Sequence, residues 1–413
     1  MKQRIKMKRL LLGIITIGLF VNISVFAQED SDKGQMTEYE NPFWDEIKEA
    51  VTDFQKEEDE PRMIFQMDVS GYDLPESIEE FTRYWHNDPI SQGWSGMCWC
   101  YSTTSFFESE IRRIYEKDLK LSELHTVYWE YVEKARRYVQ TRGKSLFAEG
   151  SQANAVKRIW EEYGCVPADI YTGMMPGQKF HGHNIMYKEM RGYLESVKER
   201  NAWNEEAVLA TIRSILDHHI GEPPSEFQYD GKKYTPETFL LQVVKLNMDE
   251  YVDIMSLKMS PYWQRAEYEV PDNWWHDSSY YNVPLDDFMN AIKKSVTDGY
   301  TLFIGGDVSE SGYIAASEIA MVPSYDIPSD YIDDNARQFR FSNKSTTDDH
   351  GIHLVGYKED ENGDHWFLIK DSGSGSRNGA NDGYYFYHED YIKLKMMNFM
   401  VHKDAVEDLL MRF

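Results

Sequence analysis

The chain has 413 residues, of which 41% are hydrophobic and 14% aromatic, and its formal net charge is −26 at pH 7. The length is enough for two or three domains, and the hydrophobic content excludes a globally disordered chain. The negative charge repels polyanions, so we expect no nucleic-acid partner.

The first 27 residues predict a secretory signal. A basic start, MKQRIKMKRL, precedes the short apolar run LLGIITIGLFVNISVF, and Ala27 with Val25 two positions earlier forms an acceptable cleavage pattern. We therefore expect export, periplasmic or secreted, after cleavage near Ala27, with no stable membrane insertion afterwards. The alternative is a retained membrane anchor, for which the apolar run is of marginal length.

The rest of the chain divides into three parts by composition. Residues 28–62 are strongly acidic and predict a solvated leader. Residues 63–260 predict an ordered N-terminal arm followed by a helical domain, and residues 261–413 predict a β-rich domain.

Helices are expected where apolar residues recur at helical spacing. One begins at Cys98, a second spans SQANAVKRIWEEYG and ends at Gly164, and a third spans NEEAVLATIRSILDHHIG and ends at Gly221. A fourth begins with Thr235 as its cap and Pro236 at its first position. Short apolar or aromatic runs then predict strands in YTLFIGGDV, GIHLVGYKED, HWFLIKDS, GYYFYHEDY and MMNFMVHKD, with a hairpin turn at KEDENGDH.

The cysteines are the first candidates for chemistry. The chain has three, Cys98, Cys100 and Cys165. Because the number is odd, at least one thiol has no internal disulfide partner in a chain that we expect to be exported. Gly93 and Gly96 interrupt regular structure just before Cys98, so we expect Cys98 near a helix N-terminus, where free N–H groups stabilise a thiolate. Cys100 should point into the core, and a buried pair of structural cysteines is the alternative. Cys165 is expected to be a buried structural thiol or a cleft residue.

A cysteine nucleophile needs a base and an orienting acceptor. His350 and His353 begin one predicted strand and face opposite sides of it, so only one of them can meet Cys98. The next strand pairs with this one through the hairpin and delivers Asp371 at its end. The arrangement is typical of acyl-transfer enzymes, although a lone histidine in a strand is more often structural.

Three segments resemble papain-like cysteine peptidases. QGWSGMCW, from Gln92 to Trp99, is similar to the nucleophile segment of that family; DHG, at 349–351, is similar to its histidine segment, and KDSG, at 370–373, to its acceptor segment. The resemblance implies that Cys98 is the nucleophile, His350 the base, Asp371 the orienting acceptor and Gln92 an oxyanion donor, with no metal or organic cofactor. It leaves His353 on the other face of the strand.

One branch of the family, the bleomycin hydrolase or aminopeptidase C type, is the more similar. His350 lies 252 positions after Cys98, whereas plain papain-like enzymes have about 130–150, and EEYGCVP resembles a segment of that branch. The resemblance implies an α+β, papain-like two-domain fold in which the active-site cleft lies between a helical and a β-rich domain. It also implies peptide substrates and aminopeptidase activity, and it leaves homo-oligomerisation open.

In that branch a C-terminal tail lies in the cleft and its carboxylate meets the substrate amine. Here DAVEDLLMRF predicts a short helix instead, so we expect an acidic residue of the helical insertion to capture the amine. An open-cleft endopeptidase, or a catalytically weakened peptide-binding protein on the same scaffold, remains an alternative.

Two departures from the family pattern bear on the site. Asp371 replaces an asparagine, which should favour the imidazolium form of His350. Gly373 replaces a tryptophan that shields the histidine contact, so that contact is expected to be wetter and weaker. A zinc hydrolase is a more distant alternative, because the candidate ligands show no firm zinc spacing; they are His181 with His183, Asp217 with His219, and His276.

Overall fold

The computed structural model describes residues 41–55, 63–361 and 363–413. The predicted signal, residues 1–27, lies outside the described residues, and so does most of the acidic leader. No helix among the described residues is long and apolar enough to cross a bilayer. The chain divides into two units, Met1–Met63 and Ile64–Phe413.

The first unit contains a helix that the composition of the leader did not predict, α1 (Pro42–Gln55). Asn41 caps it by accepting a hydrogen bond from the Trp44 N–H, and Pro42 occupies the first helical position. Phe43, Ile47 and Val51 recur every four residues along it. This spacing indicates a helix, but the many charged residues around it made the segment resemble a solvated leader.

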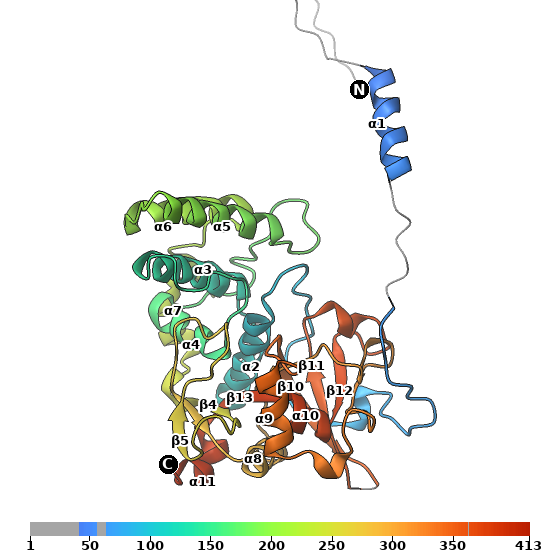
Figure 1. Ribbon diagram of the computed structural model, residues 1–413. Helices are drawn as coiled ribbons and strands as arrows, with labels where there is room; N and C mark the ends of the chain where they lie inside the picture. Colours follow the sequence, from blue (N-terminus) through green and yellow to red (C-terminus); the bar gives the residue numbers. More distant parts are fainter. Residues whose placement is uncertain (1–40, 56–62, 362) are drawn as a thin grey trace, which may run out of the picture. The chain divides into compact units, whose positions relative to one another are not determined.

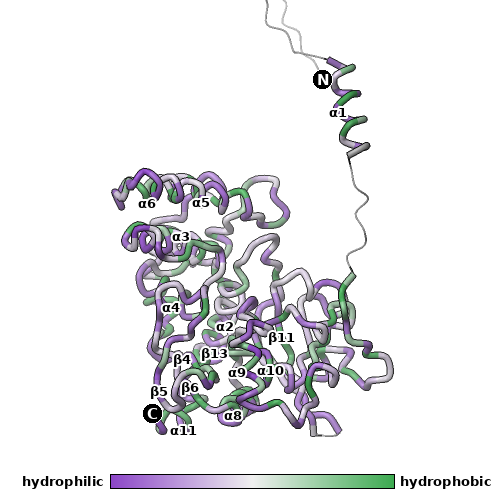
Figure 2. Tube along the Cα trace, in the orientation of Figure 1, coloured by the Kyte–Doolittle hydropathy of each residue, from purple (hydrophilic) through white to green (hydrophobic). Residues whose placement is uncertain are grey.

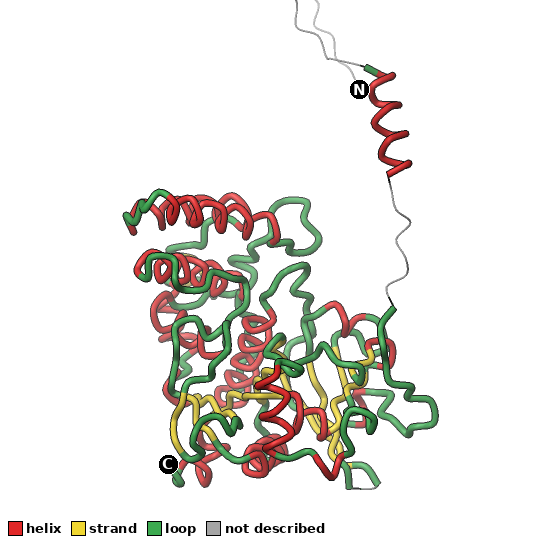
Figure 3. Tube along the Cα trace, viewed as in Figure 1, coloured by secondary structure: helices red, strands yellow, loops and turns green. Residues whose placement is uncertain are grey.

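The second unit joins a helical half to a large sheet (Figures 1 and 3). The helices are α2 (Cys98–Tyr115), α3 (Glu123–Gln140), α4 (Ala153–Tyr163), α5 (Asn184–Glu199), α6 (Glu205–Ile220), α7 (Pro236–Phe239), α8 (Leu285–Thr297), α9 (Asp334–Asn343), α10 (Glu389–Lys395) and α11 (Glu407–Leu410). Four predicted helices are confirmed by α2, α4, α6 and α7, including the Thr235 cap and the ends at Gly164 and Gly221.

The sheet has 11 strands within the described residues, ten of them in the order β5-β6-β4-β13-β7-β10-β11-β12-β9-β8, with β1 paired to β10. Their bounds are β1 (Thr82–Arg83), β4 (Tyr251–Met255), β5 (Gln264–Ala266), β6 (Tyr280–Asn282), β7 (Leu302–Gly306), β8 (Tyr313–Ile314), β9 (Ile319–Ala320), β10 (His350–Glu359), β11 (His365–Lys370), β12 (Tyr384–His388) and β13 (Met396–His402). A separate hairpin joins β2 (Phe227–Tyr229) to β3 (Lys232–Tyr234). All five predicted strands are present. β4 precedes residue 261 and pairs with β13, so the sheet begins earlier in the chain than the predicted boundary.

Helix α2 lies against β10 and β7 and connects the two halves. On one face of β10, Ile352 and Leu354 join the core around α8, while on the other His353 meets α2. Gly351 permits this approach, because a Cβ there would lie 2.7 Å from the Phe303 ring and 3.1 Å from the Ser102 Oγ. The outer helices α5 and α6 pack together beyond α3, and hydrophilic and hydrophobic residues alternate along both (Figure 2).

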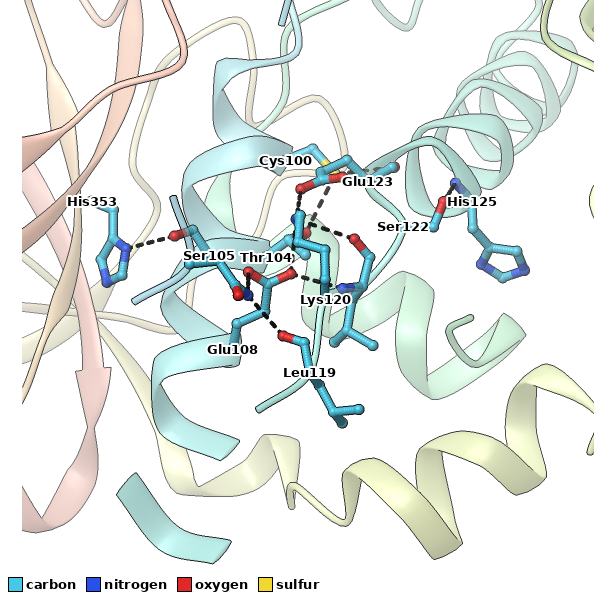
Figure 4. A network of polar contacts seen from close by, with 12 residues as sticks. Cys100, Thr104, Ser105, Glu108, Leu119, Lys120, Ser122, Glu123, His125 and His353 are labelled. Carbon is cyan, nitrogen blue, oxygen red and sulfur yellow. Dashed lines mark hydrogen bonds and ion pairs between the residues drawn. The ribbon is translucent and has the colours of Figure 1, made fainter. Parts of the chain in front are cut away.

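The buried side of α2 carries an unusually polar network (Figure 4). Lys120 donates hydrogen bonds to Glu108 and Glu123, and Lys370 donates one to the Ser105 Oγ. Charged groups are tolerated in a core only when they are paired in this way. Cys100 belongs to the same region and is fully buried, as predicted, with its Sγ donating to the Glu123 carbonyl oxygen at 3.3 Å.

Replacing Cys100 tests this packing. Cys100→Ala removes a buried sulfur and its hydrogen bond, so we expect a loss of about 1–2 kcal/mol in the free energy of unfolding. Urea denaturation measures the loss, and Lys144→Ala on the exposed loop after α3 is the control. Equal stability of the two variants would contradict the packing described.

Candidate active site

Cys98 is the first residue of α2 and is partly exposed, whereas Cys100 and Cys165 are buried. Met97 precedes it at the cap position, and no side chain caps the helix. The free N–H groups of the first turn therefore face the thiol region, and the helix dipole adds positive potential there. This agrees with the helix start predicted from the two preceding glycines.

His350 is the first residue of β10, and it brings an imidazole to the start of α2. Its Nε2 is 2.7 Å from the Asp371 Oδ1, and Cys98 is near enough to act electrostatically on the same ring. Burial alone would lower the pKa of His350, but the Asp371 carboxylate and Cys98 together raise it well above the ordinary value. Burial would likewise raise the pKa of Asp371, yet His350 and the N–H groups of Gly373 and Ser372 lower it. Both shifts favour an imidazolium–carboxylate pair.

Gln92 is held against the end of β11 by Ser372. The Gln92 N–H donates to the Ser372 carbonyl oxygen at 3.0 Å, and the Ser372 hydroxyl donates to the Gln92 Oε1 at 2.7 Å. The Gln92 Nε2 donates to the Ser95 carbonyl oxygen at 2.7 Å. An amide nitrogen carries two hydrogens, so one donor remains for an oxyanion. The motif alone did not indicate the role of Ser372, because its partner lies 280 positions away.

The structure contradicts the expected wetness of the His350–Asp371 contact. The side chains of His350 and Asp371 are only 11% and 2% exposed. Tyr313 of β8 replaces part of the missing shield: its hydroxyl lies 3.5 Å from the Asp371 Oδ2, and its ring stacks on Tyr385 with centroids 4.4 Å apart. Sequence reasoning missed Tyr313 because β8 has two residues and no motif marks it.

Gly373 leaves a different surface uncovered. A Cβ at this position would lie 3.3 Å from the Asp371 Oδ2 and 3.4 Å from the His350 Cε1, so a larger side chain would start directly over the pair. The shielding comes from the Tyr313 side instead.

His353 takes no part in this cluster. Its Nδ1 is 2.8 Å from the Ser105 Oγ in the middle of α2, and the ring is fully buried (Figure 4). Burial, with the nearby Lys370 and His86, lowers its pKa well below the ordinary value, so the ring is neutral. The predicted division between the two histidines of this strand matches this placement.

A second wall beside Cys98 comes from the loop before α4. Glu149 accepts a hydrogen bond from the Gly96 N–H at 2.7 Å, and Gln152 donates one to Asp348. Asp272 lies against Gly150, where a Cβ would be 2.1 Å from the Asp272 Oδ2. Burial raises the pKa of Asp348 to about 7, and the charge of Asp272 contributes to that rise. Sequence reasoning missed these three carboxylates, which come from separate segments.

The candidate zinc ligands do not come together. His219 pairs with Glu189 at 2.8 Å, and His276 pairs with Glu267 at 2.6 Å. His183 is buried without a hydrogen-bond partner for either ring nitrogen. In the described part of the chain, no three His, Cys, Asp or Glu side chains are grouped to hold a metal ion.

Comparisons with known proteins agree with this geometry. The sequence model of the Peptidase C1-like family matches residues 35–412. The chain belongs to this family. It is a cysteine-type peptidase, and the papain-like α+β fold predicted from the sequence is confirmed.

The individual relatives are distant. Aminopeptidase C of Listeria innocua is 22% identical over 303 residues, covering 61% of this chain and 68% of that protein. Aminopeptidase C of Streptococcus thermophilus is 22% identical over 322 residues, covering 65% and 70%. The crystal structure of PepW from Lactobacillus rhamnosis HN001 superposes with a TM-score of 0.62 at 18% identity, covering 80% of this chain and 83% of that one.

The cysteines can be separated by mutation. Cys98→Ala should abolish peptide hydrolysis and leave the thermal midpoint nearly unchanged, because loss of a nucleophile costs several orders of magnitude in rate. Cys100→Ala should instead lower stability and retain turnover. Equal losses of activity in the two variants would indicate a structural pair.

Asp371→Asn restores the amide found in the family pattern. Since the Asp371 carboxylate raises the pKa of His350, its removal should lower the pKa of the upper limb of the pH–rate profile. Substantial activity should remain below that limb. An unchanged upper limb would show that Asp371 does not govern the protonation of His350.

Proposed function

We propose that this chain is an exported cysteine aminopeptidase that cleaves peptides through a thioester intermediate. The observation that supports it most is the convergence of Cys98, His350 and Asp371 at the start of α2. Cys98 is the nucleophile, His350 the acid and base, Asp371 the group that orients His350, and Gln92 an oxyanion donor.

The reaction has two halves. The Cys98 sulfur attacks the scissile carbonyl carbon, and the oxyanion is held by the Gln92 side-chain amide and the Cys98 N–H. His350 gives its proton to the leaving amine as the C–N bond breaks. A water then attacks the thioester and gives a proton to His350, and the C–S bond breaks to release the acid and restore the Cys98 thiolate beside protonated His350.

The preference for a free N-terminus is supported by the relatives named Aminopeptidase C and by the carboxylates beside Cys98. Glu149, Asp272 and Asp348 lie along the wall formed by residues 149–152, where the three carboxylates outnumber the nearby cation Lys134, which donates to the carbonyl oxygens of Ala148 and Gly150. Glu149 belongs to the expected helical insertion, and the other two come from the β-rich part. Phe413 packs on Trp263 and Tyr281.

Paired substrates test the aminopeptidase assignment. A peptide with a free N-terminus should be cleaved much faster than its acetylated counterpart. Asp348→Asn should lower kcat/KM for the free peptide by about tenfold, the size of one charged hydrogen bond, and leave the acetylated peptide unaffected. The control is Asp330→Asn, an exposed carboxylate in the turn before α9.

Two other outcomes would select the alternatives. Rapid cleavage of the acetylated peptide would make the open-cleft endopeptidase the correct assignment. Alkylation of Cys98 without turnover of either peptide would indicate a peptide-binding protein on the same scaffold.

Export rests on the N-terminal pattern. The basic start, the apolar run and Ala27 together support cleavage after residue 27. Mass spectrometry of the protein purified from its native cells should find a mature N-terminus at Gln28. An uncleaved Met1 on protein from the cytoplasm would contradict export.

A further inference from the structure

The nucleophile segment exposes a large aromatic side chain four residues before Cys98. Trp94 is 74% exposed, although it is fixed by its backbone. The Trp94 N–H donates to the His181 carbonyl oxygen at 2.8 Å, and the His183 N–H donates to the Trp94 carbonyl oxygen at 3.1 Å. These bonds form a strand-like bridge between Trp94 and Gly182. The backbone that carries the exposed indole is therefore fixed.

The approach of the two segments is close. Gly93 has φ +65°, and a Cβ there would lie 2.3 Å from the His181 carbonyl oxygen. A side chain at position 93 would be strained twice, by the backbone conformation and by this clash. The loop that ends at His183 is thus docked directly on the nucleophile segment.

The loop adds a second aromatic group to the surface. Residues alternate along the extended bridge, so that His183 is buried at 1% exposure while Phe180 is 58% exposed. Ile90 and Met175 add further exposed apolar area. Phe180 and Ile90 also line a cavity of about 330 Å³, with Ser91, Met174 and Tyr171 among its other walls. Exposed aromatics beside a surface cavity are typical of binding surfaces.

The position of Gln92 tells which part of a substrate this surface meets. Gln92 is clamped to Ser372, next to Asp371 and its partner His350. His350 gives its proton to the leaving amine, so the leaving group departs on this side of Cys98. The carboxylates of residues 149–152 and their neighbours line the other wall.

We propose that Trp94 and Phe180 form a subsite for an apolar or aromatic side chain on the leaving-group side of the scissile bond. This inference rests on the proposed acyl-enzyme reaction, but not on whether the enzyme requires a free N-terminus. It predicts peptide substrates with an aromatic or large aliphatic residue directly after the cut or one position further.

Acyl transfer isolates this subsite from the rest of the reaction. When an amino acid amide replaces water, its nitrogen attacks the thioester carbonyl carbon, a C–N bond forms and the C–S bond breaks. His350 accepts the proton of the attacking amine, and the thiolate is the leaving group. At one acceptor concentration, the change between variants in the ratio of transfer product to hydrolysis product then measures how well the acceptor binds on the leaving-group side.

The experiment uses the full chain with a fluorogenic aminoacyl anilide as donor and either phenylalanine amide or glycine amide as acceptor. The wild-type protein should prefer phenylalanine amide. Trp94→Ser and Phe180→Ser should each reduce that preference about three- to tenfold, the effect of losing one aromatic contact. Phe339→Ser, which removes a 67% exposed aromatic on α9, is the control and should leave the ratio unchanged.

The outcomes separate this inference from the proposed function. Release of the fluorophore with the same acceptor preference in all four proteins would overturn the subsite while keeping the thioester reaction. No release by the wild-type protein with either a free or an acetylated donor would overturn the proposed function itself. Circular dichroism of each variant checks that the loop substitutions leave the fold intact.

Discussion

The packing of α2 across β10 is the constraint on which the site depends. Ser102 meets Gly351 and Ser105 meets His353, so the helix is held in one register against the strand. That register places the first residue of the helix, Cys98, beside the first residue of the strand, His350. Cys98 thereby lies beside the unpaired N–H groups of the first helical turn. His350 lies beside Asp371, with which its Nε2 forms a hydrogen bond.

The site pairs a carboxylate with the histidine where the family pattern has an amide. Such a carboxylate binds an imidazolium more strongly but must be kept ionised while buried. The N–H of Gly373 and the hydroxyl of Tyr313 meet the two oxygens of Asp371 and serve this purpose. Tyr313 of β8 therefore covers part of the contact that the tryptophan shields in the family pattern.

The sequence was most informative where chemistry and local geometry coincide. The start of α2, the assignment of β10 and β11, and the choice between His350 and His353 follow from short-range spacing that survives at low identity. Tyr313, Ser372 and Asp272 could not be found this way, because each acts through a partner far along the chain. β4 was assigned to the helical part since nothing local shows that it pairs with β13, and α1 was obscured by its charge.

Alkylation of Cys98 tests the central claim, that α2 and β10 make a reactive pair from Cys98 and His350. Substoichiometric iodoacetamide at about pH 6, where an ordinary thiol is protonated, should modify Cys98 alone, as peptide mapping would show, and His350→Ala should slow the reaction strongly. Modification of Cys98 at the rate of free cysteine, unchanged by His350→Ala, or equal modification of Cys100 and Cys165, would contradict the account.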